Sequence, residues 1–423
     1  MDAMKKKRGR RMYHLEAALE YLISILVAGS YLATLTKAIG LSDGLTGILS
    51  SVISLGCLFQ LFSVALRPKR VKRTVVVLSV LNQLLFMLLY VIPQIRISAE
   101  LKAVIFVVCI IGAYMLYYLA HPKKIAWMMS MVEEGHRGSF TANKEIISLI
   151  SGMVFSFGMG AIIDRFEAVG NLRHAFILSG IVIFVLMALH TLSMLLTPEA
   201  PGFDRPEKER RRNLAGFLKN KNLLHVMVVF ILYYVSTYVA TPFYGTYQIG
   251  ELGFSLTFVS ILTILSSVVR VLVSRAWGRY ADRHSFAFMI EKCLLLLAAG
   301  YVCTAVAVPS NGRVTFALYF VFHGIAQGGI NSALTNMIFD YVPDGERSDS
   351  LAVCQAAAGS LGFAATLSVT PLVSFIQQHG NTVFGLPLYA QQVMSGIAFL
   401  LVIVAVIYVR IFLLNKKSSK TVK

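Results

Sequence analysis

Long apolar runs constrain this chain more than any other feature of its sequence. The first extends from Ala17 to Ile39, and comparable runs recur along all 423 residues. A bilayer core about 30 Å thick is crossed by about 20 residues of helix. Because lipid offers no hydrogen bonds to the backbone, a helix satisfies its own groups where an isolated strand does not. The sequence therefore predicts an all-α integral membrane protein.

On this scale the chain contains twelve transmembrane helices in two groups of six. The expected spans are 15–39, 44–66, 74–95, 101–131, 140–164, 173–196, 223–248, 255–277, 286–308, 314–341, 351–376 and 388–413. The expected domains are an N-terminal six-helix bundle over 1–196, a linker over 197–222 and a C-terminal six-helix bundle over 223–423.

The charges are few and lie between the apolar runs. Only 14% of the residues are charged, yet the net charge is +18. Basic residues gather at 5–11, 67–73, 205–221, 275–283 and 416–423, which are alternate loops and the two ends. By the positive-inside rule, both termini and the linker are cytoplasmic in a multi-pass protein of the cell (plasma or inner) membrane. No basic face of a folded domain is present, so nucleic acid is not an expected partner.

Several kinds of site lack their sequence signatures. The five cysteines lie in apolar segments without a C-x-x-C pair, and the histidines form no H-x-x-x-H or H-E-x-x-H element. There is no G-x-x-x-x-G-K-[ST] phosphate loop. We therefore expect no metal, no cofactor and no enzymatic activity. The basic start precedes a run too long for a signal peptide, so we expect an uncleaved first helix.

The two halves repeat one another. A shift of 210 positions places Val132, Gly135, Arg137, Ala142 and Gly152 on Val342, Gly345, Arg347, Ala352 and Gly362. Because each half has six helices, the repeat is parallel, with a pseudo-symmetry axis along the membrane normal. This predicts two pseudo-symmetric six-helix bundles.

Short loop motifs carry a family resemblance. The segment 278–283 reads GRYADR, which resembles a G-x-x-x-D-R signature, and the loops 133–138 and 343–347 are similar to a P-E-x-x-R-G loop. At these places on twelve helices, they resemble the major facilitator superfamily. Two departures stand out: Arg67 replaces the usual Asp after the helix 44–66, and the helix 140–164 lacks the G-P-x-x-G-G element of drug–proton antiporters.

The resemblance implies a secondary active transporter that moves a small solute by alternating access, with proton coupling left open. A non-transporting sensor or assembly factor on the same fold is the main alternative. A membrane enzyme is a weaker one, because no catalytic cluster is visible. The expected partners are the lipid bilayer and a small solute, and we expect a monomer.

Gating residues follow from the resemblance. Asp282 is expected to cap the start of the helix 140–164 near Arg137, the alternative being a solvated loop charge. Arg67 is expected to pair with the acidic start of the helix 351–376 at Asp349, or else to be an ordinary cytoplasmic arginine. Lone charges within a membrane are usually paired. Arg270 is therefore expected either to pair with Glu145 as a gate or to bind a substrate carboxylate or phosphate.

Polar stripes on the helices around the expected cavity are candidate substrate contacts. They comprise His323, Gln327 and Asn331 at i, i+4, i+8, together with Tyr117, His121, Tyr234 and Tyr238. Their alternatives are structural hydrogen bonds between helices or an interfacial aromatic belt. Lys123 and Lys124 lie within the helix 101–131, where one of them faces the cavity or both snorkel. The basic groups favour an anionic or zwitterionic solute.

Proton coupling requires a group that titrates. The candidates are Glu20, Glu145, His121 and His323, and the sequence does not choose among them. Glu16 and Glu20 lie near the start of the first helix beside the basic N terminus, so they are also readily explained as surface charges.

Overall fold

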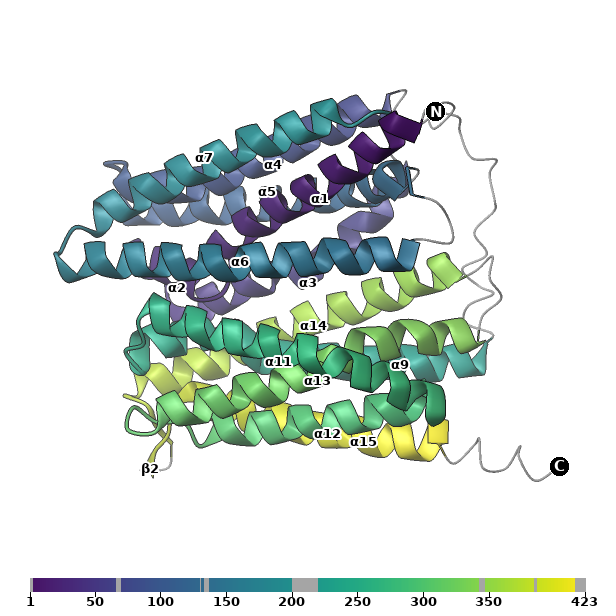
Figure 1. Cartoon of the computed structure of the whole chain (residues 1–423). Helices are drawn as coiled ribbons and strands as arrows, with labels where there is room; N and C mark the ends of the chain where they lie inside the picture. Colours follow the sequence, from purple (N-terminus) through teal and green to yellow (C-terminus); the bar gives the residue numbers. More distant parts are fainter. Residues whose placement is uncertain are drawn as a thin grey trace. The chain divides into compact units, whose positions relative to one another are not determined.

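A computed structural model shows an almost entirely helical protein (Figure 1). It describes residues 3–65, 70–129, 131–132, 137–199, 220–341, 347–383 and 386–414. The helices of the first half are α1 (Ala3–Leu26), α2 (Gly29–Ala38), α3 (Asp43–Ala65), α4 (Val71–Val91), η1 (Ile92–Gln94), α5 (Ala99–Met129), α6 (Arg137–Ala168) and α7 (Leu172–Leu196).

The second half continues in the same manner. It comprises α9 (Lys221–Ala240), η3 (Thr241–Phe243), α10 (Tyr244–Thr246), η4 (Tyr247–Glu251), α11 (Leu256–Arg283), α12 (Phe286–Ala305), α13 (Gly312–Tyr341), α14 (Arg347–Gln378), α15 (Ala390–Val409) and η6 (Arg410–Leu414). The strands β1 (Thr382–Val383) and β2 (Leu386–Pro387) pair antiparallel between α14 and α15.

Many of these elements are long and apolar enough to cross a membrane in the described part of the chain. Nine segments are long and apolar enough to cross a bilayer, and the bent pair α1–α2 makes a tenth. The remaining long helices of the described residues are α3, with a shorter apolar stretch over Asp43–Gly56, and α13. Large apolar side chains such as Val154, Phe184 and Leu272 are exposed along the helices, as expected for surfaces that face lipid. The predicted all-α membrane fold is confirmed.

The chain divides into two compact units, and two helices run from one unit into the other. Unit 1 comprises 1–42, 56–210 and 254–260, and unit 2 comprises 43–55, 211–253 and 261–423. Consequently α3 changes unit between Leu55 and Gly56, and α11 changes unit between Ser260 and Ile261. The predicted domain limits at 196 and 223 remain a prediction.

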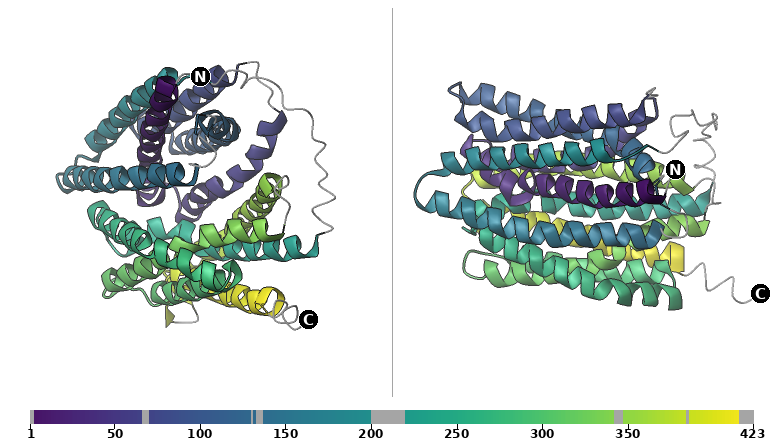
Figure 2. Two further views of the ribbon diagram at one scale, coloured as in Figure 1. Left: turned by 45° about the vertical axis from the view of Figure 1, so that its right-hand side comes forward. Right: turned by 45° about the horizontal axis from the view of Figure 1, so that its top comes forward.

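Within each unit the long helices run along a common direction (Figure 2). In unit 1, α1 packs against α6 and α7, and α4 packs against α5 and α7. In unit 2, α12 packs against α13 and α15, and α9 packs against α14 and α15.

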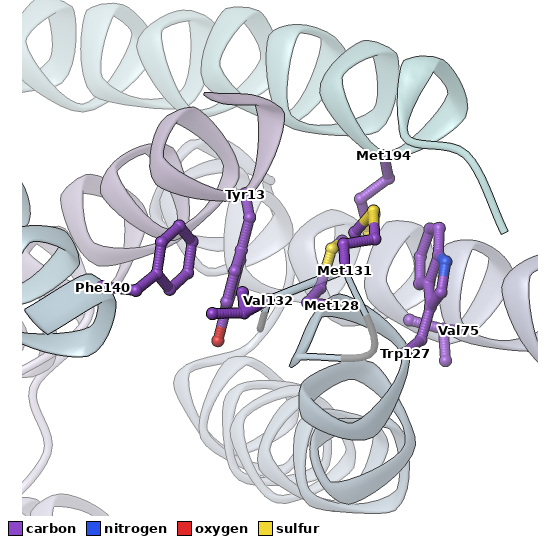
Figure 3. Close-up of a cluster of buried hydrophobic side chains, with 8 residues drawn as sticks. All are labelled: Tyr13, Val75, Trp127, Met128, Met131, Val132, Phe140 and Met194. Carbon is purple, nitrogen blue, oxygen red and sulfur yellow. The ribbon is translucent and has the colours of Figure 1, made fainter. Parts of the chain in front are cut away.

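One hydrophobic cluster ties together the helix ends of unit 1. Its buried members are Tyr13, Val75, Trp127, Met128, Met131, Val132, Phe140 and Met194, drawn from α1, α4, α5, α6, α7 and the turn after α5 (Figure 3). The indole Nε1 of Trp127 donates to the carbonyl oxygen of Pro198 at 3.1 Å. The cluster thereby fixes the end of unit 1 at which α1 begins.

The first helix differs from its predicted span of 15–39 at its start and by a bend within it. It begins at Ala3 rather than at residue 15, because the basic segment continues as helix where Gly9 packs against Met131 and Pro198. A bend of 43° then separates α1 from α2. Gly29 starts α2 with a φ of +53°, a conformation that glycine adopts without a Cβ clash.

Replacing Trp127 by alanine tests the cluster. Because Trp127 is fully buried, we expect Trp127→Ala to destabilise the protein by about 3 to 5 kcal/mol. The measurement is the melting temperature of the purified protein in detergent. Val154→Ala is the control, since Val154 is 72% exposed; equal melting temperatures for the two variants would contradict the role of the cluster.

Candidate functional site

Four charged or titratable side chains meet inside unit 1. Glu16 and Glu20 come from α1, Lys124 from α5 and His190 from α7. The Lys124 Nζ lies 2.8 Å from the Oε1 of Glu16 and also contacts the Oε2 of Glu20. The Nε2 of His190 lies 3.1 Å from the Oε1 of Glu16 and 3.6 Å from the Oε2 of Glu20. We call these four residues the charge cluster.

Helix geometry explains why these residues meet. Glu16 and Glu20 are four residues apart, so both carboxylates project from one face of α1. Since α1 packs directly against α7 and also contacts α5, that face is covered by two helices. Glu16 and His190 are completely buried, whereas the side chain of Glu20 is 19% exposed. Glu20 is therefore the more accessible of the two carboxylates of the cluster.

The charges of the cluster do not balance unless a proton is added. Two carboxylates and one ammonium leave one negative charge when His190 is neutral. A buried, uncompensated charge is costly in a medium of low dielectric constant. Protonation of His190 or of one carboxylate would make the cluster neutral.

The side-chain amide of Gln83 on α4 contacts His190, and its orientation depends on which ring nitrogens of His190 carry a proton. Its Nε2 lies 3.0 Å from the Nδ1 of His190. With the amide in this orientation, Nδ1 accepts and the imidazole is neutral, with its Nε2 proton directed at Glu16. Rotating the amide would bring Oε1 to Nδ1, which then requires a doubly protonated ring. Among the described residues, neither Oε1 of Gln83 nor Oε2 of Glu16 has a hydrogen-bond partner.

Aromatic groups adjoin the cluster on α5. The ring of Tyr117 lies 5.9 Å from the Nζ of Lys124 and 5.0 Å from the ring of His121. His121 is half-buried, and its Nδ1 has no hydrogen-bond partner in the described parts of the chain. Lys123, the neighbouring residue, is also half-buried. Tyr117 and His121 thus lie on one face of α5, as predicted from their spacing.

The cluster also has the donor geometry of a cation site. Donor atoms of Glu16, Glu20 and His190 lie within 4.8 Å of one another. However, the Nζ of Lys124 contacts both carboxylates, so its ammonium supplies the positive charge there. The ammonium of Lys124 thus occupies the position that a bound cation would take between the two carboxylates.

A second polar group lies within unit 2. The Nε2 of Gln327 on α13 donates to the hydroxyl of Tyr233 on α9 at 2.6 Å and lies 3.4 Å from the Nε2 of His323. The ring of His323 contacts that of Tyr319 at 5.4 Å. His323 and Gln327 therefore lie on one face of α13, as their spacing predicts.

The remaining predicted substrate contacts also lie in unit 2. Tyr234 and Tyr238 stack with ring centroids 5.9 Å apart. Gly362 on α14 lies against both, since an added Cβ would come within 3.1 Å of Tyr238. Arg270 on α11 is half-buried, and Asn331 at the far end of the α13 stripe is exposed. Their role in binding remains a prediction.

The predicted gating residues are only partly described. Arg67 lies outside the described residues, and Arg137, Asp282 and Asp349 are placed on helices whose side chains at these positions are not described. Glu145 belongs to unit 1 and Arg270 to unit 2, so each is placed only within its own unit. All these pairings remain predictions.

Glu20 was predicted from the sequence as a titratable group, but most of its partners were not. Glu16 has a weak signal, its i, i+4 spacing to Glu20 at the start of an apolar run. Lys124 was not separated from Lys123, and His190 and Gln83 were not singled out. Isolated polar residues within apolar helices are the signal that would have found the last two.

Known proteins share this arrangement of helices. A family model described as Major Facilitator Superfamily matches residues 17–366 and 226–423. No curated protein matches the chain.

Similar solved structures share the fold at low sequence identity. The nucleoside transporter NupG has a TM-score of 0.72 and 12% identity, covering 97% of this chain and 99% of that one. A D-xylose-proton symporter has a TM-score of 0.70 and 13% identity, with 95% and 97% covered. A bacterial homolog of the human lysosomal transporter Spinster, inward-facing and unoccupied, has a TM-score of 0.71 and 12% identity, with 97% and 98% covered.

Removing the ammonium tests the charge cluster. We expect Lys124→Met to destabilise the protein by about 3 to 5 kcal/mol, because it leaves two buried carboxylates unpaired. Adding Glu16→Gln should recover part of this loss by removing one of those charges. Melting temperatures in detergent provide the measurement. If Lys124→Met is as stable as the parent protein, the ion pairs contribute nothing and the cluster is misassigned.

Proposed function

Because the chain belongs to the major facilitator superfamily and is a secondary transporter, we propose that it moves a small anionic or zwitterionic solute together with a proton. The observation that carries the proposal is the ammonium of Lys124 held between the carboxylates of Glu16 and Glu20. A proton on one carboxylate breaks its ion pair with the ammonium, and the anionic group of a solute can then pair with the ammonium instead.

The proton is taken up at Glu20. Glu20 is the more exposed of the two carboxylates, so a proton reaches it more easily than it reaches Glu16. Protonation removes its attraction for Lys124, and Glu16 with His190 still holds the other side of the ammonium. His190 is the alternative proton site, with Gln83 turning its amide to match.

The solute binds where Glu20 releases the ammonium. A carboxylate or phosphate of the solute then satisfies Lys124, with Tyr117 and His121 beside it. The Nδ1 of His121 offers a hydrogen-bonding atom that has no partner in the described residues. Without the proton, Glu20 and the solute anion compete for one ammonium. This competition couples the two ions, since the net charge of the site with both the proton and the anion bound equals its net charge with neither bound.

Unit 2 has a set of candidate solute contacts of its own. The stacked rings of Tyr234 and Tyr238 offer an apolar surface, and His323 and Gln327 offer hydrogen bonds. Arg270 is suited to an anionic group because its guanidinium presents a planar fork of donors. Asn331 and Lys123 are peripheral contacts.

The remaining assignments complete the proposal. The protein is a monomer of the cell membrane with cytoplasmic termini, and Asp282, Arg137, Arg67, Asp349 and Glu145 act as gates between alternating states. It has no enzymatic activity and needs no cofactor. A symporter among the structural neighbours supports proton symport as a mechanism available to this fold. The sensor alternative is excluded by any measured flux.

A ligand screen tests the class of solute. We expect small carboxylates or phosphates to raise the melting temperature at acidic pH, while their neutral amide or alcohol analogues do not. Lys124→Gln should abolish the increase. A hit among neutral compounds that Lys124→Gln leaves unchanged would contradict the proposed anion site.

Uptake of the identified solute into proteoliposomes tests the coupling. We expect Glu20→Gln to lose accumulation driven by a pH gradient while keeping exchange of labelled for unlabelled solute, because the amide imitates the protonated acid. Glu100→Gln is the matched control, since Glu100 is exposed at the start of α5. Full gradient-driven accumulation by Glu20→Gln would show that Glu20 does not carry the coupled proton.

A further inference from the structure

Asp164 near the end of α6 binds the start of another helix. Its Oδ1 accepts the backbone N–H of Leu256 at 2.9 Å, and its Oδ2 accepts that of Thr257 at 2.8 Å. These are the first two residues of α11, a helix of 28 residues. One carboxylate therefore satisfies two of the N–H groups that a helix leaves unpaired at its N terminus.

The contact is also electrostatically favourable. The N terminus of a helix carries a partial positive charge, which attracts an anion. A carboxylate that accepts two backbone N–H groups makes charge-assisted hydrogen bonds, which are stronger than neutral ones. Asp164 thus supplies α11 with a cap that comes from a different helix.

A stripe of small residues brings the two helices close enough for this cap. Gly160 lies one turn before Asp164, and a Cβ there would come within 3.1 Å of the backbone of Leu256. One turn earlier, the hydroxyls of Ser156 and Ser260 are 2.9 Å apart. The hydroxyl of Tyr31 donates to the carbonyl oxygen of Ser156 at 2.6 Å.

The position of the contact gives it a role in transport. Residues 254–260 belong to unit 1, whereas the rest of α11 belongs to unit 2. The cap therefore fastens unit 1 to a helix that continues into unit 2. Any rocking of one unit against the other must either bend α11 after Ser260 or release its N terminus from Asp164.

We infer that Asp164 is a positioning residue of the transport cycle, a releasable cap that stabilises the end state in which α11 is docked on α6. The contact is suited to release, because it consists of hydroxyls, backbone groups and a carboxylate that water can satisfy once they separate. An apolar contact of the same size would expose hydrophobic surface on opening.

The cap complements a prediction from the sequence. Asp282 lies at the opposite end of α11, and the family resemblance implies that it caps the start of α6. By that resemblance, Asp282 would play the corresponding role for α6. The cap at Asp164 is independent of proton coupling, so its test does not depend on the cluster around Lys124.

Maleimide labelling tests this role in the full-length protein. In a Ser260→Cys parent, the introduced thiol lies in the docked contact and should react slowly. We expect Asp164→Ala to increase the labelling rate of this thiol about fivefold, as expected for the loss of a helix cap. Asp164→Asn should give a smaller increase, because it keeps an oxygen acceptor and loses the charge.

Two controls separate a shift between states from unfolding. Glu167→Gln removes a charge from the same helix at an exposed position, so it should leave the labelling rate unchanged. The native Cys109 is buried in unit 1, and its labelling should not change in any variant. An unchanged rate in Asp164→Ala, or an equal rise at Cys109, would overturn the inference.

Discussion

The ion pairs of Lys124 with two carboxylates impose the main physical constraint on this protein. Ionised groups within a membrane are tolerated when they pair with one another, as this ammonium pairs with two carboxylates. Glu16, which is completely buried, fixes one side of that arrangement, and Glu20, which is partly exposed, leaves the other side open to exchange. The unequal burial of the two carboxylates gives them unequal roles, since a fully exposed pair would be hydrated and a fully buried pair would not exchange its proton.

The two repeats bury different kinds of side chains at equivalent positions. The shift of 210 positions places Glu16, Glu20 and Lys124 on Val226, Phe230 and Leu334, all of which are buried apolar residues of unit 2. Unit 2 instead has a neutral polar group, in which Gln327 joins His323 and Tyr233. The related halves have therefore diverged in their interiors, since unit 1 buries charged side chains where unit 2 buries neutral ones.

Much of the fold was predictable because it follows from local rules. The length of the apolar runs predicts the helices, the distribution of charges between the runs predicts their orientation, and the shift of 210 positions predicts the repeat. Glu20 and His121 were recognised as titratable groups within helices, but their partners were not, because four different helices contribute Gln83, Lys124, His190 and the two glutamates. No sequence pattern distinguishes Asp164 from an ordinary charged residue near the end of a helix. Its role becomes visible only in the structure, where it accepts the backbone N–H of Leu256 at the start of α11. Such contacts depend on tertiary packing, which spacing within one helix does not encode.

The most direct test is whether one carboxyl of the charge cluster changes protonation within the folded protein. Infrared difference spectra of the protein in lipid vesicles, recorded between acidic and neutral pH, report protonated carboxyl groups through their carbonyl band. We predict a band that appears on acidification, shifts in response to a bound anion and is missing in Glu20→Gln. A spectrum in which Glu20→Gln removes no carboxyl band would contradict the central claim that Glu20 releases Lys124 by taking up a proton.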